Sequence, residues 1–466
     1  MFKPLNLLLF FLLTACHVGH DYQQPLFISD QDVLKELTLT PSEKNITTDW
    51  YKMFKDKDLN TLLSHLNHSN LTIKQAIERL KQSRLQFAIQ SKQSFPMIDA
   101  KGGYTYQKAH TQSSYATDIN TFKIGFDSVW EVDIWGKGQY LSEQYFELMK
   151  NSKYNLLHLR AIITAEIASN YINLRKAQEQ LKIAKHNLSL QNDILNSISD
   201  KHAAGITDDL ALNQAQFSVE QTKSTIPPLE LDVENNKNSL AVLLGVTPNR
   251  LPINLDKPSK NITASTFKYT VKDLYKLPLN ILRTRPDILA AEAEIRAQNA
   301  AVNKAITELY PDVDLSASFG YVSVSGKSLI SPQKQLYGYA PTLSLPIWHW
   351  KQLQNNIDLQ KHIREEYLLN YNNVLLTALV ELKNAIYAVE KAYNTNIHQH
   401  NSFYKMKKIM ALTNEKYIHG LVNFTDVAAA EQNLLEAQLS LADSNAQILQ
   451  SIIAFYKATG GGYNLK

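Results

Sequence analysis

Two neighbouring stretches of the chain alternate between apolar and polar residues. In residues 122–134 the even positions are mostly large and apolar, and the odd positions are mostly polar. In residues 98–107 one face is formed by Ile98, Ala100, Tyr104 and Tyr106. A period of two is that of a β-strand with one wet face and one apolar face. The pattern therefore predicts two strands, at about 98–110 and about 120–134.

The same pattern returns 215 residues later, and this offset holds along most of the chain. The pairs of scarce residues that coincide under it include Pro96 with Pro311, Trp135 with Trp350, Gly205 with Gly420, and Gly245 with Gly460. Such self-similarity predicts a tandem repeat of one half-molecule of about 175 residues. A second pair of strands is therefore expected at about 312–325 and about 335–347, with the same alternation.

Each half continues into a long segment without helix breakers. Residues 139–204 and 347–419 contain neither glycine nor proline. At ~1.5 Å per residue, a helix of this length would span about 100 Å. A glycine and a second long helical pattern follow, so the fold class is mostly α, with long antiparallel helices and four β-strands.

The second long helix of each half carries a seven-residue repeat. In the second half the large residues of this row are Val427, Leu434, Leu441, Ile448 and Phe455. In the first half they are Leu212, Val219, Ile226, Val233 and Leu240. A seven-residue row predicts close packing of helices with left-handed supercoiling. Pro227-Pro228 predicts an interruption and a kink in the first-half helix.

The N-terminus has the features of a secretory signal. Lys3 precedes an apolar stretch from Leu5 to Leu13, which is too short to span a bilayer as a mature helix. Leu13-Thr14-Ala15-Cys16 then resembles a bacterial lipobox, and Cys16 is the only cysteine of the chain. These residues predict a signal peptide at 1–15 and acylation of Cys16, and the resemblance to enteric lipoproteins implies sorting to the outer membrane. An ordinary signal peptide with an incidental cysteine is the alternative.

Composition and motifs exclude several other classes. The formal net charge is only +4 for 48 Lys+Arg and 44 Asp+Glu, which argues against a nucleic-acid binder. Phosphate-loop, HExxH and GxSxG motifs are absent from the sequence. The histidines are scattered without neighbouring cysteines or carboxylate clusters. We therefore expect no enzyme activity, no metal site and no cofactor.

The predicted strands have features of membrane-embedded ones. They are long enough for a transmembrane β-segment, which needs ~9–11 residues, and their apolar faces are rich in aromatic residues. Four tryptophans lie at or just past strand ends, as expected at a membrane interface: Trp130, Trp135, Trp348 and Trp350. Four strands are too few to close a membrane barrel, and open edges in lipid are forbidden. Several chains would therefore share one barrel.

Three motifs, taken together and in order, resemble a known family. Cys16-His17-Val18-Gly19-His20-Asp21-Tyr22 through Pro25 resembles a CxVGPDYxxP start, with His20 in place of proline. Trp50, Phe54, Asp56 and Leu59 form a WxxxFxDxxL segment that resembles one of the family, and Arg285 to Ile288 with Ala291-Glu292 fit an RPDIxxAE signature. The whole chain is similar to TolC-like outer membrane factors, of the lipoprotein branch that includes OprM and NodT-type proteins.

The resemblance implies a specific assembly. A homotrimer would combine four strands per chain into a shared twelve-stranded barrel and its helices into a periplasmic α-barrel. The channel would conduct substrates passively from a periplasmic adaptor protein and an inner-membrane pump, usually of the RND class, to the exterior. The protein would lie in the outer membrane, lipid-anchored through Cys16, with a long periplasmic extension.

The repeat and the resemblance together divide the chain into six segments. These are a signal peptide at 1–15, a lipid-anchored and equatorial region at 16–69, a first efflux repeat at 70–245, a connector at 246–285, a second efflux repeat at 286–460 and a tail at 461–466.

The resemblance also assigns roles at the two helix turns. The tips that would contact the adaptor contain Gly205, Ile206, Thr207, Asp208 and Asp209 in one half, and Gly420, Leu421 and Val422 in the other. Glycine there is also explained by a left-handed turn. Asp426 lies where the family has an aspartate that constricts the closed tunnel, whereas Ala429 replaces a second one. We expect Asp426 to face the pore and act as a gate; a capping or solvated carboxylate is the alternative.

Two other functions remain open at this point. The chain could be the exit duct of a type I protein secretion system, or a lipid-anchored structural coiled-coil stalk. The lipobox and the RPDI signature favour efflux over secretion. The stalk predicts strands outside the membrane and no conductance.

Overall fold

The computed structural model describes residues 18–25, 27, 29–37, 40–41, 47–110, 116–256, 276–278 and 280–463. The chain divides into two compact units. Unit 1 comprises the described residues among 1–25, 79–153 and 290–372, and unit 2 comprises those among 26–78, 154–289 and 373–466. Cys16 lies outside the described residues.

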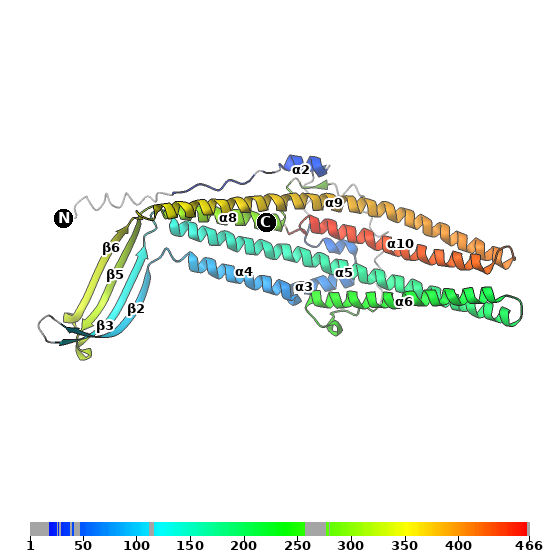
Figure 1. The fold of residues 1–466 in the computed structure, drawn as a ribbon, viewed down its shortest axis with the longest axis horizontal. Helices are drawn as coiled ribbons and strands as arrows, with labels where there is room; N and C mark the ends of the chain where they lie inside the picture. Colours follow the sequence, from blue (N-terminus) through cyan, green and yellow to red (C-terminus); the bar gives the residue numbers. More distant parts are fainter. Residues whose placement is uncertain are drawn as a thin grey trace. The chain divides into compact units, whose positions relative to one another are not determined.

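Unit 1 contains an antiparallel sheet with the strand order β2-β3-β5-β6 (Figure 1). Its strands are β2 (Met97–His110), β3 (Ala116–Glu131), β5 (Asp312–Ser323) and β6 (Gln335–Ser344). The pairing register aligns Ala100, Phe126, Phe319 and Tyr337 across the sheet. All four residues belong to the faces predicted to be apolar. The predicted alternation and its recurrence in the second half are thus confirmed.

Several strand boundaries differ from the predicted ones, and β3 and β5 end at Glu131 and Ser323, before the predicted ends. β3 begins at Ala116, earlier than expected, because residues 116–119 continue the backbone pairing with 107–110. Backbone pairing does not require apolar side chains, so the alternation pattern missed this extension. β6 ends at Ser344 rather than near residue 347. Pro346 lacks the N–H that a continuing strand would use.

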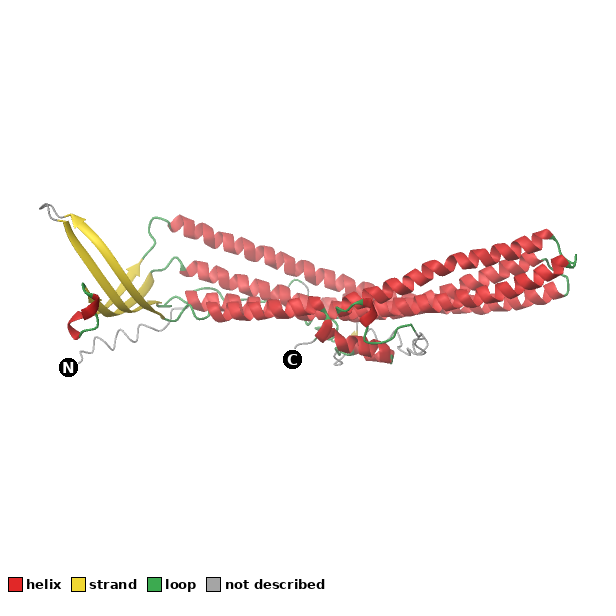
Figure 2. Ribbon diagram, turned by 90° about the horizontal axis from the view of Figure 1, so that it is seen from below, coloured by secondary structure: helices red, strands yellow, loops and turns green. Residues whose placement is uncertain are grey.

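The long helices form two antiparallel hairpins, drawn in red in Figure 2. The first consists of α5 (Lys137–Ala203) and α6 (Asp209–Leu244), and the second of α9 (Trp350–Ile418) and α10 (Phe424–Ala458). α5 has 67 residues and α9 has 69, as the absence of breakers predicted. At ~1.5 Å per residue, each is about 100 Å long. The shorter helices α4 (Leu71–Gln90) and α8 (Pro286–Thr307) precede the two strand pairs.

The predicted interruption of the first-half helix is wrong. α6 runs continuously from Asp209 to Leu244 and includes Pro227 and Pro228. Packing on both sides of the proline pair outweighs the missing N–H groups, because Val219 and Leu240 are buried at 2% and 0% exposure. The predicted seven-residue rows of α6 and α10 are confirmed as inward-facing, since all of their large residues are buried or half-buried.

Side-chain hydrogen bonds and an ion pair connect the helices within unit 2. Asn396 Nδ2 on α9 donates to Ser444 Oγ on α10 at 2.9 Å. Asn187 Nδ2 on α5 donates to Gln438 Oε1 on α10 at 2.9 Å. The last link joins α5 to α6 through Lys185 and Glu230, whose Nζ and Oε1 lie 2.7 Å apart. α10 therefore contacts both α9 and α5, and α5 contacts α6. α6 also contacts α10 directly, since Thr425 Oγ1 donates to Gln214 Oε1 at 3.0 Å.

Short elements complete unit 2. They are α2 (Asp30–Leu37), β1 (Thr40–Pro41), η1 (Trp50–Phe54), α3 (Lys57–Ser69), η2 (Pro248–Arg250) and β4 (Lys276–Leu277). The WxxxFxDxxL segment is part of this core, because Trp50 stacks on Tyr456 with 5.0 Å between the ring centroids. Asp56 Oδ1 accepts hydrogen bonds from Leu59 N at 2.9 Å and from the Tyr171 hydroxyl at 2.8 Å. The motif therefore has a structural role. In unit 1, η4 (Gly326–Ser328) and η5 (Pro332–Lys334) connect β5 to β6.

Two glycines allow a matched test of this packing. Gly205 and Gly245 have φ values of +71° and +66°. A Cβ on Gly245 would lie 2.6 Å from Ser69 O, whereas one on Gly205 would meet no described atom within 4 Å. We expect Gly205→Ala to cost about 1 kcal/mol from the left-handed backbone. Gly245→Ala should cost about 1–3 kcal/mol more from the clash. Thermal unfolding midpoints in detergent measure both; equal midpoints would contradict the close contact with Ser69.

Candidate functional site

The two hairpin turns are closed by the same hydrogen bonds. Gly205 N donates to His202 O at 2.9 Å, and Ile206 N donates to Lys201 O at 2.8 Å. The second turn repeats both, from Gly420 N to Tyr417 O at 3.0 Å and from Leu421 N to Lys416 O at 2.9 Å. Glycine is needed at each turn because its φ is near +70°. The duplication thus extends to the backbone of the tips.

Apolar side chains project from both turns. Ile206 is 73% exposed and Leu421 is 71% exposed, whereas Thr207 and Val422 are half-buried. A buried cluster behind them contains Ile198, Ala211, Ala215, Phe424 and Val427. The cluster joins both hairpins, so the tips form one packed end with apolar side chains at its surface.

The acidic residues of the first turn have local structural contacts. Asp208 is the N-cap of α6 and accepts a hydrogen bond from Ala211 N at 3.1 Å. Asp209 Oδ1 lies 2.7 Å from His202 Nε2. Both aspartates are exposed. Their negative charge at the N-terminus of a helix also complements the helix dipole.

Asp426 takes part in a capping box at the start of α10. Its carboxylate accepts a hydrogen bond from Asn423 N at 3.2 Å and remains exposed. The capping interpretation therefore describes its contacts within the chain. A capping carboxylate can still face a pore, because only some of its lone pairs are occupied.

One face of the sheet in unit 1 exposes large apolar side chains. Tyr337 and Tyr339 on β6 are 77% and 86% exposed, and Ile98, Phe126 and Phe319 on the other strands are also exposed. The opposite face is polar. There Asp127 Oδ2 lies 3.3 Å from Lys101 Nζ, and Asp127 Oδ1 lies 3.7 Å from Lys123 Nζ. The sheet thus separates an aromatic surface from a charged one.

The four tryptophans near the strand ends fall into two groups. The indole N–H of Trp130 donates to Ser94 O at 2.9 Å, and that of Trp135 donates to Pro311 O at 2.7 Å. Trp348 and Trp350 are exposed. Trp130 and Trp135 therefore fasten the strand ends to neighbouring backbone.

The segment after the lipobox is held against the helices of unit 1. Tyr140 Oη donates to Val18 O at 2.8 Å. Asn303 Nδ2 donates to His20 O at 3.0 Å, and His20 N donates to Asn303 Oδ1 at 3.1 Å. The proline that the resembling motif has at this position could not make the second bond. A Cβ on Gly19 would lie 2.5 Å from Tyr140 Oη, so this close approach requires glycine.

The RPDI signature forms a clamp in unit 2. Arg285 Nη1 donates to Ala458 O at 2.7 Å, and Arg285 Nη2 donates to Asp287 Oδ2 at 2.7 Å and to Glu381 Oε2 at 2.9 Å. It therefore connects α8, α9 and the end of α10. The first half has an uncharged counterpart at the same offset, because Asn70 Nδ2 donates to Leu243 O.

Burial alone would raise the pKa of Asp287. The hydrogen bonds and positive charge of Arg285 outweigh this effect and hold the pKa below its usual value. The ionised pair therefore contributes to the stability of the folded clamp.

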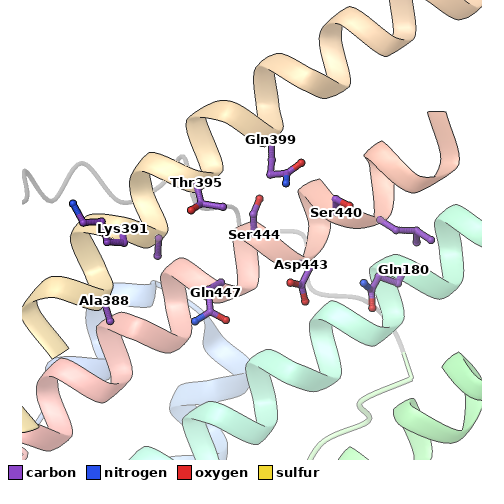
Figure 3. A pocket seen from close by; sticks show the side chains of 11 residues that line it. Gln180, Ala388, Lys391, Thr395, Gln399, Ser440, Asp443, Ser444 and Gln447 are labelled. Carbon is purple, nitrogen blue, oxygen red and sulfur yellow. The ribbon is translucent and has the colours of Figure 1, made fainter. Parts of the chain in front are cut away.

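A polar groove of about 610 Å³ lies between α9, α10 and α5 (Figure 3). Ser440, Asp443, Ser444 and Gln447 line it from α10, Thr395 and Gln399 from α9, and Gln180 from α5. Asp443 is paired with Lys176 at 3.1 Å. The described residues contain no group of three or more His, Cys, Asp and Glu side chains placed to hold a metal ion. Within the same residues, no helix has the length and apolar character needed to cross a membrane.

Comparison with known proteins decides the family. The family model "Outer membrane efflux protein" matches residues 62–246 and 277–461. The chain belongs to the outer membrane efflux protein family. The two matched ranges begin at 62 and 277, so they are offset by the 215 residues of the internal repeat.

Individual relatives match this efflux protein over nearly its whole length. The cation efflux system protein CusC of Escherichia coli O6:H1 is 25% identical over 456 residues, which cover 97% of this chain and 96% of CusC. The "Probable outer membrane lipoprotein SilC" of Salmonella typhimurium is 23% identical over 99% of both chains. The crystal structure of the Campylobacter jejuni CmeC outer membrane channel matches with a TM-score of 0.87 and 24% identity over 96% of both chains.

The predicted family, fold class, outer membrane location and efflux function are therefore confirmed. The solved relatives are channel proteins. Sequence reasoning missed the contacts of Tyr140 and Asn303 with the segment after the lipobox, and the clamp partners Glu381 and Ala458. The spacing of 215 residues between Asn70 and Arg285 could have indicated the clamp, although their side chains differ in chemistry.

The clamp makes stability depend on pH in this efflux protein. The folded pKa of Asp287 is lowered, so its contribution is present above the unfolded value of ~3.9 and is lost as pH falls through the folded value. We expect the unfolding midpoint to drop below about pH 4, and Asp287→Asn to flatten part of that drop. Unfolding midpoints measured between pH 2.5 and pH 7 test this. Parallel curves for both proteins would contradict it.

Proposed function

We propose that three copies of this outer membrane efflux protein assemble into one duct. The duct receives substrates from a periplasmic adaptor and an RND-type inner-membrane pump and conducts them passively to the exterior. Each chain contributes four strands to a shared twelve-stranded barrel and its long helices to a periplasmic tunnel.

The open edges of the sheet carry this proposal. β2 and β6 each have a strand neighbour on one side only among the described residues. Unpaired backbone groups are too costly in lipid, so a sheet that enters a bilayer must close. The sheet alternates in direction through four strands, so β6 of one copy can pair with β2 of the next and continue the antiparallel pattern. The exposed aromatic face would then contact lipid, and the charged face would line the barrel.

The position of the N-terminal segment supports the lipid anchor. Val18 is held by Tyr140, close to the start of α5, and His20 by Asn303, close to the end of α8. β3 ends at Glu131, a few residues before α5, and β5 begins at Asp312, a few residues after α8. Cys16 precedes Val18 by two residues, a reach of about 7 Å. Acyl chains on Cys16 would thus start near the ends of the strands that enter the bilayer, and the relative SilC is named as a lipoprotein.

The hairpin tips are the surface proposed for the adaptor. Ile206 and Leu421 offer exposed apolar contact area on a packed end, flanked by Asp208 and Asp209. CusC is named for cation efflux. The polar side chains of the groove between α9 and α10 do not define a preference for one class of substrate. We therefore assign the choice of substrate to the pump.

Acylation of Cys16 predicts a defined chemical mass. We expect the N-terminal peptide of the purified protein to begin at Cys16 and to carry a diacylglyceryl group and one further acyl chain. Mass spectrometry of that peptide measures this. Cys16→Ser is the control and should yield no acylated peptide. An unmodified Cys16 within a peptide that retains residues 1–15 would contradict the anchor.

The gate predicts a change in conductance. Asp426→Asn keeps an oxygen that can accept from Asn423 N but removes the negative charge. If three Asp426 carboxylates narrow the tunnel, the variant should show larger single-channel conductance and lower cation selectivity in planar bilayers.

Asp208→Asn is the matched control for the gate. Asp208 also caps a helix at a tip, by accepting from Ala211 N. Its substitution should leave conductance and selectivity near those of the unmodified protein. Equal currents from all three proteins would contradict a gating role for Asp426.

A further inference from the structure

We infer that α6 of one copy packs against α9 of the next copy in one fixed register, in which Phe217 lies over Ala411 and Tyr404 lies over Ser224. This inference rests on the proposed trimer and names the contact that closes its helical part. It concerns the parts of α6 and α9 that lie in unit 2.

α6 and α9 each expose one face that the other long helices do not cover. α10 contacts α9 through Asn396 and Ser444, and α5 through Asn187 and Gln438. α5 contacts α6 through Lys185 and Glu230. Two different faces on one chain close a ring when the face on α6 of each copy meets the face on α9 of its neighbour, which is a heterologous interface.

α6 carries an outward row with a period of seven, distinct from its buried row. Its members are Leu210, Phe217, Ser224 and Leu231, all of them exposed. The three apolar members are between 60% and 67% exposed. A seven-residue repeat of large apolar side chains is the pattern of a helix–helix seam. Among the described residues, no other element of the chain covers this row.

α9 carries a second outward row with the same period. Its members are Ile397, Tyr404, Ala411 and Ile418, all of them exposed. The three large members are between 56% and 73% exposed. Two edges that each expose a continuous apolar row are what a heterologous interface requires.

The two rows are complementary in size when both are counted from the hairpin turns. Leu210 is the second residue of α6, and Ile418 is the last residue of α9. Antiparallel pairing from this point sets Leu210 against Ile418, Phe217 against Ala411, Ser224 against Tyr404, and Leu231 against Ile397. Each of the two aromatic rings therefore faces a small residue. Alternation of large and small residues is how facing helices interdigitate.

Charges beside the rows fit the same register. Glu220 lies between Phe217 and Ser224 on α6, opposite Lys407 and Lys408, which lie between Tyr404 and Ala411 on α9. All three side chains are exposed in the single chain, and Glu220 is paired with Lys223 of its own helix at 2.7 Å. A register shifted by seven residues would place Phe217 against Tyr404, and two aromatic rings would then compete for one space.

Disulfide cross-linking tests the register directly. Phe217→Cys with Ala411→Cys should give covalent dimers and trimers on a non-reducing gel after oxidation with copper phenanthroline. Products with two and three times the mass of the chain report bonds between copies, whereas a bond within one chain leaves a monomer. Phe217→Cys alone is the background control, because Cys16 is the only native cysteine.

A shifted pair provides the matched control. Phe217→Cys with Tyr404→Cys displaces one thiol by seven residues, about 10 Å along the helix. Disulfides form only when the Cα atoms lie within ~7 Å, so this pair should give at least tenfold less product. Leu231→Cys with Ile397→Cys provides a second pair in the inferred register if the first fails to fold.

Two further experiments exchange the sizes of the facing side chains and measure the oligomeric state on a native gel. Phe217→Ala and Ala411→Phe should each lower the temperature at which the trimer dissociates, and the double variant should recover at least half of that loss. If the protein is trimeric on the native gel but both cysteine pairs cross-link equally, the register is overturned while the duct stays intact. The same holds if a trimeric protein cross-links through neither pair. A protein that is monomeric on the native gel would instead overturn the proposed assembly on which the register rests.

Discussion

The backbone of a strand in lipid must have every N–H and C=O group paired, and this requirement governs the rest of the assembly. One chain supplies four strands and leaves the outer edges of β2 and β6 without a strand partner among the described residues. Closure must then come from other copies of the chain. In unit 2, α6 and α9 likewise expose rows of apolar side chains that no other described element covers. Both units therefore have edges whose natural partner is the opposite edge of an identical chain.

The duplication explains why these edges complement each other. Each repeat supplies a strand pair, a long helix and a return helix, closed by a turn with the same hydrogen bonds. The copies have diverged where they meet the rest of the chain. Asn70 makes a neutral hydrogen bond to Leu243 O, whereas Arg285 at the equivalent position binds Ala458 O and two carboxylates. At this repeated position a guanidinium therefore contacts three helices in the second half, whereas an amide makes one hydrogen bond to the return helix in the first half.

Much of the fold could be predicted from periodicity alone. The alternation of Phe126 and its neighbours, the offset that relates it to Pro341, and the scarcity of breakers gave correct strand faces and helix lengths, because burial imposes those periods directly. Local rules failed where tertiary packing outweighed them, as at Pro227 and Pro228. The site was harder to predict. Whether Asp426 caps a helix, faces a pore or does both depends on neighbouring chains, and the outward rows of α6 and α9 are distinguished from the buried ones only once burial is known.

The central claim is that three identical chains complete one duct. Native mass spectrometry of the purified, acylated protein in detergent tests it most directly, because it counts chains without assuming a contact. The account predicts one dominant species with three times the mass of the mature acylated chain, and dissociation into monomers only on activation in the gas phase. A dominant monomer or dimer under conditions that preserve the helical fold would contradict it.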